Sequence, residues 1–489
     1  MKDSGNFEIS KKWYASKSVW KQVFISSAVW NFYFMTGMCV GAPTVFVPQI
    51  RREANSTDAV DEETASWLYS IFGVSSMPWI LLLPSASRYI GLRIPFITSC
   101  FVMLLVFLIL YFSTSINQLI FAEIMEGYVH ACNIIISIAV ISEYTSPKYR
   151  GMFLTIKSAS FFWGIWLSNI IGTFFHWKYI AVFGMLCCCQ TFTSILWPES
   201  PHWLASKGRF RDCKASYRWL HDRTEESERE LRQLIESHTD YSKSRANGQG
   251  SYNFAQYTKR EFYKPLFLMM TSVTQYHFSG KFVCSVYILD ILRKITQSES
   301  TAYTGMLILD GVTLLGMYAG CVLTRFLSRR TMYLTSSMFG VLFLFLISTY
   351  LYLVRFTLID ENKYLSILLL TCFSISVGCG PMIMTTTIYG EIIPSKYKVT
   401  LHLAIGLLFH MYSTGLLKIA PWVFRSLGLH GIFLFYAIVT GMCTFLLYVY
   451  LPETKDKTLQ EIEENFVGKD RLETAPSCEE TDLFVAKRS

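Results

Sequence analysis

The sequence predicts an all-α membrane protein with twelve transmembrane helices, and three observations support this fold class. Of the 489 residues, 52% are hydrophobic and only 16% are charged, whereas about a quarter of the residues in an average soluble domain are charged. The mean hydropathy of the whole chain is +0.33, which a lone anchor helix would not produce. The apolar residues also gather into runs of roughly 20, the length that crosses a hydrocarbon core of about 30 Å.

Polar residues separate the predicted spans into two sets of six. The first set comprises residues 23–47, 66–83, 94–111, 119–141, 153–174 and 180–197, and the second comprises 265–292, 303–323, 332–352, 365–388, 401–423 and 432–451. Each span must be a helix, because an open strand would leave backbone N–H and C=O groups unsatisfied in lipid. A membrane β-barrel would instead show shorter segments of alternating polarity.

The two sets of spans define the domain organisation. We expect a cytoplasmic N-terminus (1–22), a first six-helix domain (23–197), a cytoplasmic linker with short helices (198–264), a second six-helix domain (265–451) and a cytoplasmic tail (452–489). With both termini inside, about 33 of the 44 Lys and Arg residues are cytoplasmic and about eight are external, as the positive-inside rule requires. The sequence therefore predicts a multi-pass membrane protein with both termini in the cytoplasm.

Composition also argues against several other functions. The net charge of +8 follows from this topology, because the basic residues are scattered through short loops, so we expect no nucleic-acid partner. The 13 cysteines lie mostly inside apolar runs and are interpreted as small hydrophobic residues rather than a disulfide framework. The sequence contains no HExxH, Gly-x-Ser-x-Gly or phosphate-binding glycine motif. We therefore expect no enzyme activity, no metal and no other cofactor.

One glycosylation motif lies in the first external loop. Asn55-Ser56-Thr57 is the only Asn-x-Ser/Thr sequon in the chain, and an outward-facing loop is where glycosylation requires it. We therefore predict a glycan on Asn55. This location also favours the plasma membrane.

Two loop patterns recur about 240 to 250 residues apart, which indicates that one half of the chain is a parallel copy of the other. After the fourth span, Glu143 precedes Arg150 by seven residues, and after the tenth span Glu391 precedes Lys398 by the same spacing. The loops after the second and eighth spans also match, since both are short and basic.

The most specific motifs follow the sixth and twelfth spans. Residues 198–204 read Pro-Glu-Ser-Pro-His-Trp-Leu, and residues 452–455 read Pro-Glu-Thr-Lys. With these motifs the sequence resembles, over nearly its whole length, the sugar-porter branch of the major facilitator superfamily, and is most similar to the insect trehalose and glucose facilitators. The resemblance implies two six-helix domains that rock around a central site. It also implies a cytoplasmic gate network that locks the outward-facing state, formed by Glu143, Arg150, Glu199, Arg329, Arg330, Glu391, Lys398 and Glu453.

The resemblance places a sugar site in the second half, where this chain departs from the family pattern. Span seven of the family carries Gln-Gln-x-Ser-Gly-x-Asn, whereas residues 276–282 read Tyr-His-Phe-Ser-Gly-Lys-Phe. The implied substrate-binding residues are Ser158, Tyr276, His277, Ser279, Phe282, Tyr287, Thr313, Met384, Thr386 and His410, with Met384 and Thr386 as alternatives for one aromatic position. Losing four or five hydrogen-bond partners at about 1 kcal/mol each would weaken hexose binding unless other groups replace them.

Ionisable residues inside the predicted spans form a further cluster, comprising Glu123, Glu126, Lys157, Lys281 and Asp310. A charge near the bilayer centre costs about 2.5 to 3.5 kcal/mol, so these side chains must pair or face water. Glu123 and Glu126 share one helix face with His130. Two interpretations stay open, which are pairing among themselves and direct contact with substrate or a proton. Coupling through these acids is the weaker hypothesis, because span one carries no acid.

The leading interpretation is a monomeric carrier in the lipid bilayer that moves a small polar solute, a sugar such as trehalose or a hexose, by alternating access as a facilitative uniporter. One alternative is a transporter of an organic ion or other non-sugar solute, which the added Lys, His and aromatic residues favour. Another is a non-transporting sugar sensor, which the altered motifs favour. The short segment after residue 451 favours transport over sensing.

Overall fold

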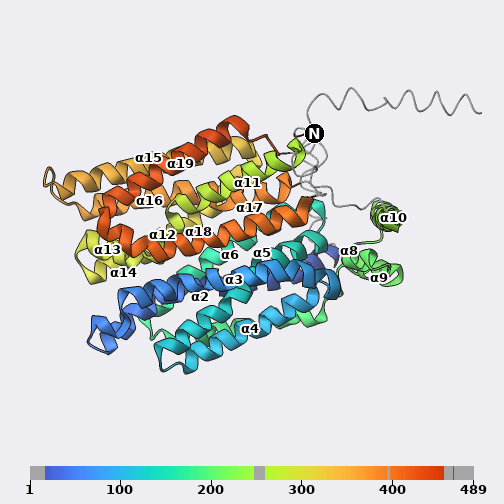
Figure 1. The fold of residues 1–489 in the computed structure, drawn as a ribbon, viewed down its shortest axis with the longest axis horizontal. Helices are drawn as coiled ribbons and strands as arrows, with labels where there is room; N and C mark the ends of the chain where they lie inside the picture. The colour runs from blue at the N-terminus through green and yellow to red at the C-terminus, as the bar shows by residue number, and fades with distance from the viewer. Residues whose placement is uncertain (1–16, 247–258, 394–396, 456–465, 467–489) are drawn as a thin grey trace, which may run out of the picture.

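The computed structural model describes residues 17–246, 259–393, 397–455 and 466, and within these ranges every regular element is a helix. Figure 1 shows long helices lying side by side in one bundle, with the N-terminal half in blue to teal and the C-terminal half in yellow to red. The side chains of Thr386, Glu391 and Lys398 lie outside those that the structure describes.

The N-terminal half contains six long helical segments that correspond to the first six predicted spans. They are α2 (Lys17–Glu53), α3 (Glu62–Ile90), α4 (Arg93–Phe112), α5 (Ile116–Tyr144), α6 (Pro147–Phe174) and α7 (Lys178–Thr191), which the short 3-10 helix η2 (Phe192–Leu196) continues. A second 3-10 turn, η1 (Thr57–Val60), lies between α2 and α3. The first helix is longer than the predicted span 23–47 at both ends.

The C-terminal half contains two broken spans. The seventh consists of α11 (Arg260–Phe278), α12 (Lys281–Val286) and α13 (Ile288–Thr296), and the tenth consists of α16 (Lys363–Cys379) and α17 (Pro381–Ile392). The other spans are α14 (Glu299–Phe326), α15 (Arg329–Arg355), α18 (Lys398–Ser426) and α19 (Gly428–Tyr450). Gly280 has φ of 77°, which disfavours other residues, and a Cβ there would lie 2.5 Å from the Tyr436 ring. Pro381 begins α17, where the missing N–H is not needed.

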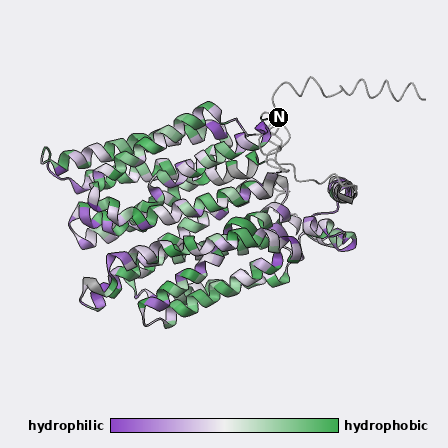
Figure 2. Cartoon of the chain, in the orientation of Figure 1, coloured by the Kyte–Doolittle hydropathy of each residue, from purple (hydrophilic) through white to green (hydrophobic). Residues whose placement is uncertain are grey.

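The outer surface of the bundle is apolar. Ten helices among the described residues are long and apolar enough to cross a membrane. The remaining two predicted spans lie in the same bundle, where α6 packs along α2 and α11 packs against α19. Leu81, Phe121, Leu315 and Phe445 are each more than half exposed, and Figure 2 shows hydrophobic residues along the helices of both halves. Such a surface suits lipid rather than water.

Three further helices lie outside the bundle at one end, which we call the linker end (Figure 1). They are α8 (Pro201–Ser206), α9 (Phe210–Leu220) and α10 (Glu225–Ala246). The start of α2 holds α9 in place, because Ser18 Oγ donates to the Leu220 carbonyl at 2.7 Å and Lys21 Nζ donates to the Trp219 carbonyl at 2.8 Å. The linker helices are therefore fixed to the first half of the chain.

Candidate functional site

Two histidines from opposite halves face each other at the centre of the bundle. The ring centroids of His130 on α5 and His410 on α18 lie 6.0 Å apart, with the rings nearly perpendicular. His130 is held from its own half, because its Nε2 bonds Glu126 Oε1 at 3.1 Å and Phe72 stacks on its ring at 4.2 Å. His410 is 1% exposed, and neither of its ring nitrogens has a hydrogen-bond partner in the part of the chain that the structure describes.

An aromatic wall in the C-terminal half adjoins His410. His277 packs edge-on against Phe409 at 4.5 Å between centroids, and Tyr276 lies 5.5 Å from the same ring. Both nitrogens of His277 are bonded, Nδ1 to the Val273 carbonyl at 3.0 Å and Nε2 to Ser413 Oγ at 2.8 Å. His277 is therefore fixed in orientation, whereas His410 keeps its hydrogen-bonding capacity.

The buried charges of the N-terminal half are held by neutral groups and by each other. Lys157 Nζ donates to the Asn133 carbonyl at 3.1 Å and lies 4.0 Å from the centre of the Tyr33 ring. The carboxyls of Glu123 and Glu126 share a hydrogen bond. The two acids thus lie beside each other, while Lys157 is stabilised by a carbonyl and an aromatic face. Pairing of these charges or their contact with a solute stays a prediction.

A second buried network joins the two halves at α6. Asn169 Nδ2 of α6 donates to Asp310 Oδ2 of α14 at 2.7 Å. Asp310 also interacts electrostatically with Lys281, whose Nζ donates to Ser374 Oγ of α16 at 3.3 Å. Lys281 and Asp310 are 1% and 6% exposed, so two opposite charges lie near each other away from water, although no direct ion pair joins them among the described residues.

Several residues assigned by family resemblance bond to their own helices. Ser158 Oγ donates to the Leu154 carbonyl, Ser279 Oγ to the Tyr276 carbonyl and Thr313 Oγ1 to the Leu309 carbonyl. Phe282 and Met384 are buried apolar side chains. Tyr287 is different, because its ring lies 4.7 Å from Tyr69 of the first half while its hydroxyl donates to the Leu417 carbonyl.

The two proline-glutamate motifs make the same contact in each half. Glu199 Oε1 accepts from the backbone N–H groups of Leu92 and Arg93 at the start of α4. Glu453 accepts in the same way from the N–H groups of Arg329 and Arg330 at the start of α15. A carboxylate at a helix N-terminus is favourable, since it satisfies free N–H donors and complements the helix dipole.

These donors act on the charge of Glu453, which lies beyond the last span. Partial burial raises the pKa of its carboxyl, but the N–H groups of Lys455, Arg330 and Arg329 outweigh burial and leave that pKa below its usual range. The carboxylate therefore stays ionised at neutral pH.

Three other predicted gate residues also have contacts within their own half of the chain. Glu143 accepts a hydrogen bond from Ser200 Oγ and interacts electrostatically with Arg150. Arg330 donates from its guanidinium to the Tyr448 carbonyl at 2.6 Å, within the second half. A lock between the halves through these residues stays a prediction, since the side chains of Glu391 and Lys398 are not among those described.

Comparison with known proteins places this arrangement in a family. A family model described as "Sugar (and other) transporter" matches residues 20–466. The chain belongs to this sugar transporter family. Trehalose transporter 1 of Drosophila melanogaster is 25% identical over 473 residues, covering 93% of this chain and 52% of the relative. A facilitated trehalose transporter of Bombyx mori is 27% identical over 331 residues, covering 66% of this chain and 63% of the relative. The chain thus spans about half the length of the Drosophila relatives it matches.

Solved structures confirm the major facilitator fold of this sugar transporter family member. The proton:xylose symporter XylE bound to 6-bromo-6-deoxy-D-glucose has a TM-score of 0.73 at 14% identity, covering 91% of this chain and 99% of that chain. The inward-open conformation of XylE from E. coli has a TM-score of 0.67 at 12% identity, covering 90% of this chain and 98% of that chain. The predicted fold class of twelve helices in two six-helix repeats is therefore confirmed.

Sequence reasoning missed three aromatic residues at the centre of the bundle. Tyr33, Phe72 and Phe409 line the centre, yet each lies inside a span as an ordinary apolar residue. Phe409 had one usable signal, since it immediately precedes His410 in the predicted site. No sequence signal distinguishes Tyr33 or Phe72, because their role depends on how α2 and α3 pack in the family fold.

Ion pairs join the two halves at the end opposite the linker helices. Arg52 of α2 lies 2.7 Å from Glu299 of α14, and Arg425 of α18 lies 2.8 Å from Glu62 of α3. Lys418 Nζ also donates to Ser66 Oγ at 2.8 Å. The two halves of this sugar transporter fold are therefore in contact at this end.

We expect Glu299→Gln to weaken the contact between α2 and α14. Arg52 and Glu299 are 61% and 56% exposed, and exposed pairs contribute up to about 1 kcal/mol, which corresponds to roughly a five-fold change in population. Fluorescence energy transfer between labels on the ends of α2 and α14 should report a larger mean separation. Glu361→Gln is the matched control, because Glu361 contacts Gln297 of its own half. An unchanged separation in Glu299→Gln would contradict the prediction.

Proposed function

We propose that the chain is a sugar carrier that works by alternating access and moves trehalose or a hexose down its gradient. The observation that carries the proposal is the pair His130 and His410, which approach from opposite halves at the buried centre. A solute bound by both imidazoles contacts both halves at once. Opening either end would then release it on one side of the membrane.

The chemistry around this pair suits a polyhydroxylated solute. An imidazole ring offers one donor and one acceptor, so His410, unpaired within the described ranges, can bond a sugar hydroxyl in either role. Tyr276 and Phe409 offer apolar ring faces beside it. The relatives named trehalose transporters support the same substrate class, although this chain spans only about half the length of the Drosophila ones.

The orientation in the membrane belongs to the same proposal. We place the linker end and both termini in the cytoplasm, and the opposite end outside the cell, at the plasma membrane. Asn55 supports this, because it is exposed at the opposite end of α2 from the linker helices. A shift of the purified protein to lower mass on treatment with an amidase that removes N-glycans would support it, and Asn55→Gln should remove the shift.

Uptake of labelled trehalose and glucose into proteoliposomes tests the function. We expect saturable uptake that empty vesicles lack, and a half-saturation concentration about ten-fold higher for His410→Ala, because two hydrogen-bonding nitrogens are lost at about 0.5 to 1.5 kcal/mol each. His410→Asn should keep part of the affinity, since an amide offers a donor and an acceptor. His430→Ala is the matched control, because His430 lies beside Arg355 at the opposite end from the linker helices.

A second candidate is a carrier of an organic cation, favoured by Glu126 beside His130 at the interface between the halves. A neutral-sugar site should ignore amines, so competition by charged amine analogues together with no sugar uptake would favour this candidate. Sugar binding without uptake would instead favour a sensor.

A further inference from the structure

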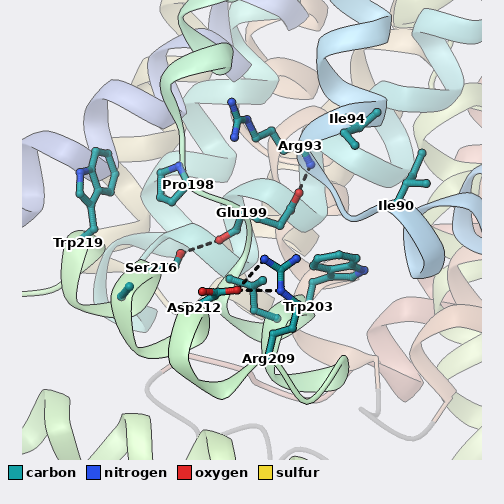
Figure 3. Close-up of a pocket in the computed structure, with 12 residues that line it drawn as sticks. Ile90, Arg93, Ile94, Pro198, Glu199, Trp203, Arg209, Asp212, Ser216 and Trp219 are labelled. Carbon is teal, nitrogen blue, oxygen red and sulfur yellow. Dashed lines mark hydrogen bonds and ion pairs between the residues drawn. The ribbon is translucent and has the colours of Figure 1, made fainter.

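A pocket of about 570 Å³ opens at the linker end, away from the central site. Figure 3 shows its walls, which come from the ends of α3 and α4 on one side and from α8 and α9 on the other. Ile90 and Ile94 line it and are 42% and 49% exposed on the apolar surface of the bundle. The pocket therefore lies where lipid-facing helices meet the polar linker helices.

The two acids of this pocket are already bound by donors of the chain. Glu199 accepts from the N–H groups of Leu92, Arg93 and Ser200, and Asp212 lies 2.6 Å from the guanidinium of Arg209 (Figure 3). Asp212 is balanced by Arg209, whereas Glu199 keeps a negative charge that the N–H groups at the start of α4 stabilise.

Two further cations, Arg93 and Lys207, have no ion pair among the described residues, so one positive charge remains in excess after Glu199 is counted. The guanidinium of Arg93 donates to the Ile195 carbonyl, and its Nε is buried without a hydrogen-bond partner among the described residues. Lys207 Nζ lies 5.4 Å from the Tyr89 ring centre and 5.9 Å from that of Trp203, which lines the pocket. A carbonyl or an aromatic ring carries no negative charge, so neither cation is neutralised by its contacts. The pocket therefore has a positive edge beside an apolar wall.

We propose that this pocket binds the headgroup of an anionic phospholipid from the cytoplasmic leaflet. Arg93 and Lys207 supply the positive charge for the phosphate, and Ile90 and Ile94 supply apolar surface for the first carbons of the acyl chains. Basic pockets on the cytoplasmic side of membrane proteins attract anionic lipids by about 1 kcal/mol per Lys or Arg. The bound lipid would join the linker helices to α3 and α4. The leaflet assignment rests on the orientation given under the proposed function.

Native mass spectrometry of the full chain in detergent tests this site with dioctanoyl phosphatidylserine, dioctanoyl phosphatidylcholine and inorganic phosphate. We expect phosphatidylserine to bind at least five-fold more tightly than phosphatidylcholine, and Arg93→Gln and Lys207→Gln each to weaken it about five-fold. Arg93→Lys keeps the charge and should keep most of the binding. Arg211→Gln is the matched control, because Arg211 lies on α9 outside the pocket lining.

Three results would overturn the inference. Equal binding of the two lipids would show that the pocket does not select a lipid by its charge. An equal loss of binding in Arg211→Gln would show a general attraction to the surface rather than a site. Competition by inorganic phosphate as strong as that by phosphatidylserine would show a free-anion site instead. If Arg93→Gln does not fold, Lys207→Gln carries the test. Binding is measured without sugar, so a chain that fails to transport sugar can still bind the lipid.

Discussion

Replacing Gly73 with tryptophan is expected to abolish uptake while leaving the chain folded. Gly73 of α3 faces α18 of the other half, and a Cβ there would lie 2.0 Å from Thr414 Oγ1 and 3.3 Å from the His410 carbonyl oxygen. An indole at this position prevents the two halves from reaching the contact seen here. Overpacking by a few methylenes already costs about 1 to 3 kcal/mol. We therefore expect the population of the conformation in which α3 packs on α18 to fall roughly 100-fold or more.

Uptake into proteoliposomes and size-exclusion chromatography together check this prediction. The variant should elute as the parent does, because the clash lies at the contact between the two halves and not between helices of one half. Gly415→Trp is the matched control, since Gly415 also lies on α18 but a Cβ there meets nothing within 4 Å. Uptake at the parental rate in Gly73→Trp would show that transport does not require the conformation in which α3 packs on α18.

Lys281→Met is expected to cause the largest loss of stability. The substitution leaves Asp310, which is 6% exposed, without the positive charge that compensates it. Leaving a buried charge without compensation costs up to about 3 to 5 kcal/mol, because the remaining charge is far from water. The measurement is the free energy or midpoint of unfolding of the purified protein in detergent.

A double variant separates charge from packing. Lys281→Met with Asp310→Asn removes both charges and keeps an amide oxygen that can accept from Asn169, so most of the lost stability should return. Lys178→Met is the matched control, because Lys178 is only partly buried at the start of α7. If the double variant is as unstable as Lys281→Met, the loss comes from packing rather than from charge.

The hydropathy pattern predicts the spans of this fold well but not their interruptions. The predicted span 265–292 is three helices, with breaks at Ser279-Gly280 and at Tyr287, and the span 365–388 is two, with a break at Gly380 before Pro381. Hydropathy averages over a window of residues, so a break of one or two residues leaves the average unchanged. The glycine and proline were visible in the sequence, but only packing against Tyr436 shows why Gly280 is needed.

The site was less predictable than the fold. Position alone assigned Ser158, Ser279 and Thr313 to the substrate, whereas in the structure their hydroxyls bond carbonyls of their own helices, a common alternative for Ser and Thr in helices. The approach of His130 to His410 joins residues 280 positions apart, so no local spacing reveals it.

The glutamine of the seventh span also shows that the sequence does not reveal which way a side chain faces. Gln275, the remaining glutamine beside Tyr276, bonds Thr444 and Tyr333 inside the second half rather than facing the centre. From the sequence alone, Gln275 can be placed only by its neighbours in the chain, next to the predicted site residue Tyr276. Only the helix orientation shows that it is used for structure.

The carboxylate contacts of Glu199 and Glu453 bear on the order of biosynthesis. Each carboxylate holds the start of a helix that precedes it by more than 100 residues, since Glu199 bonds Leu92 and Glu453 bonds Arg329. The ribosome therefore delivers the acceptor only after the sixth helix of that half has been made. Each half is completed by its own last residues, so the first half can reach its final form in the membrane before the second has been translated.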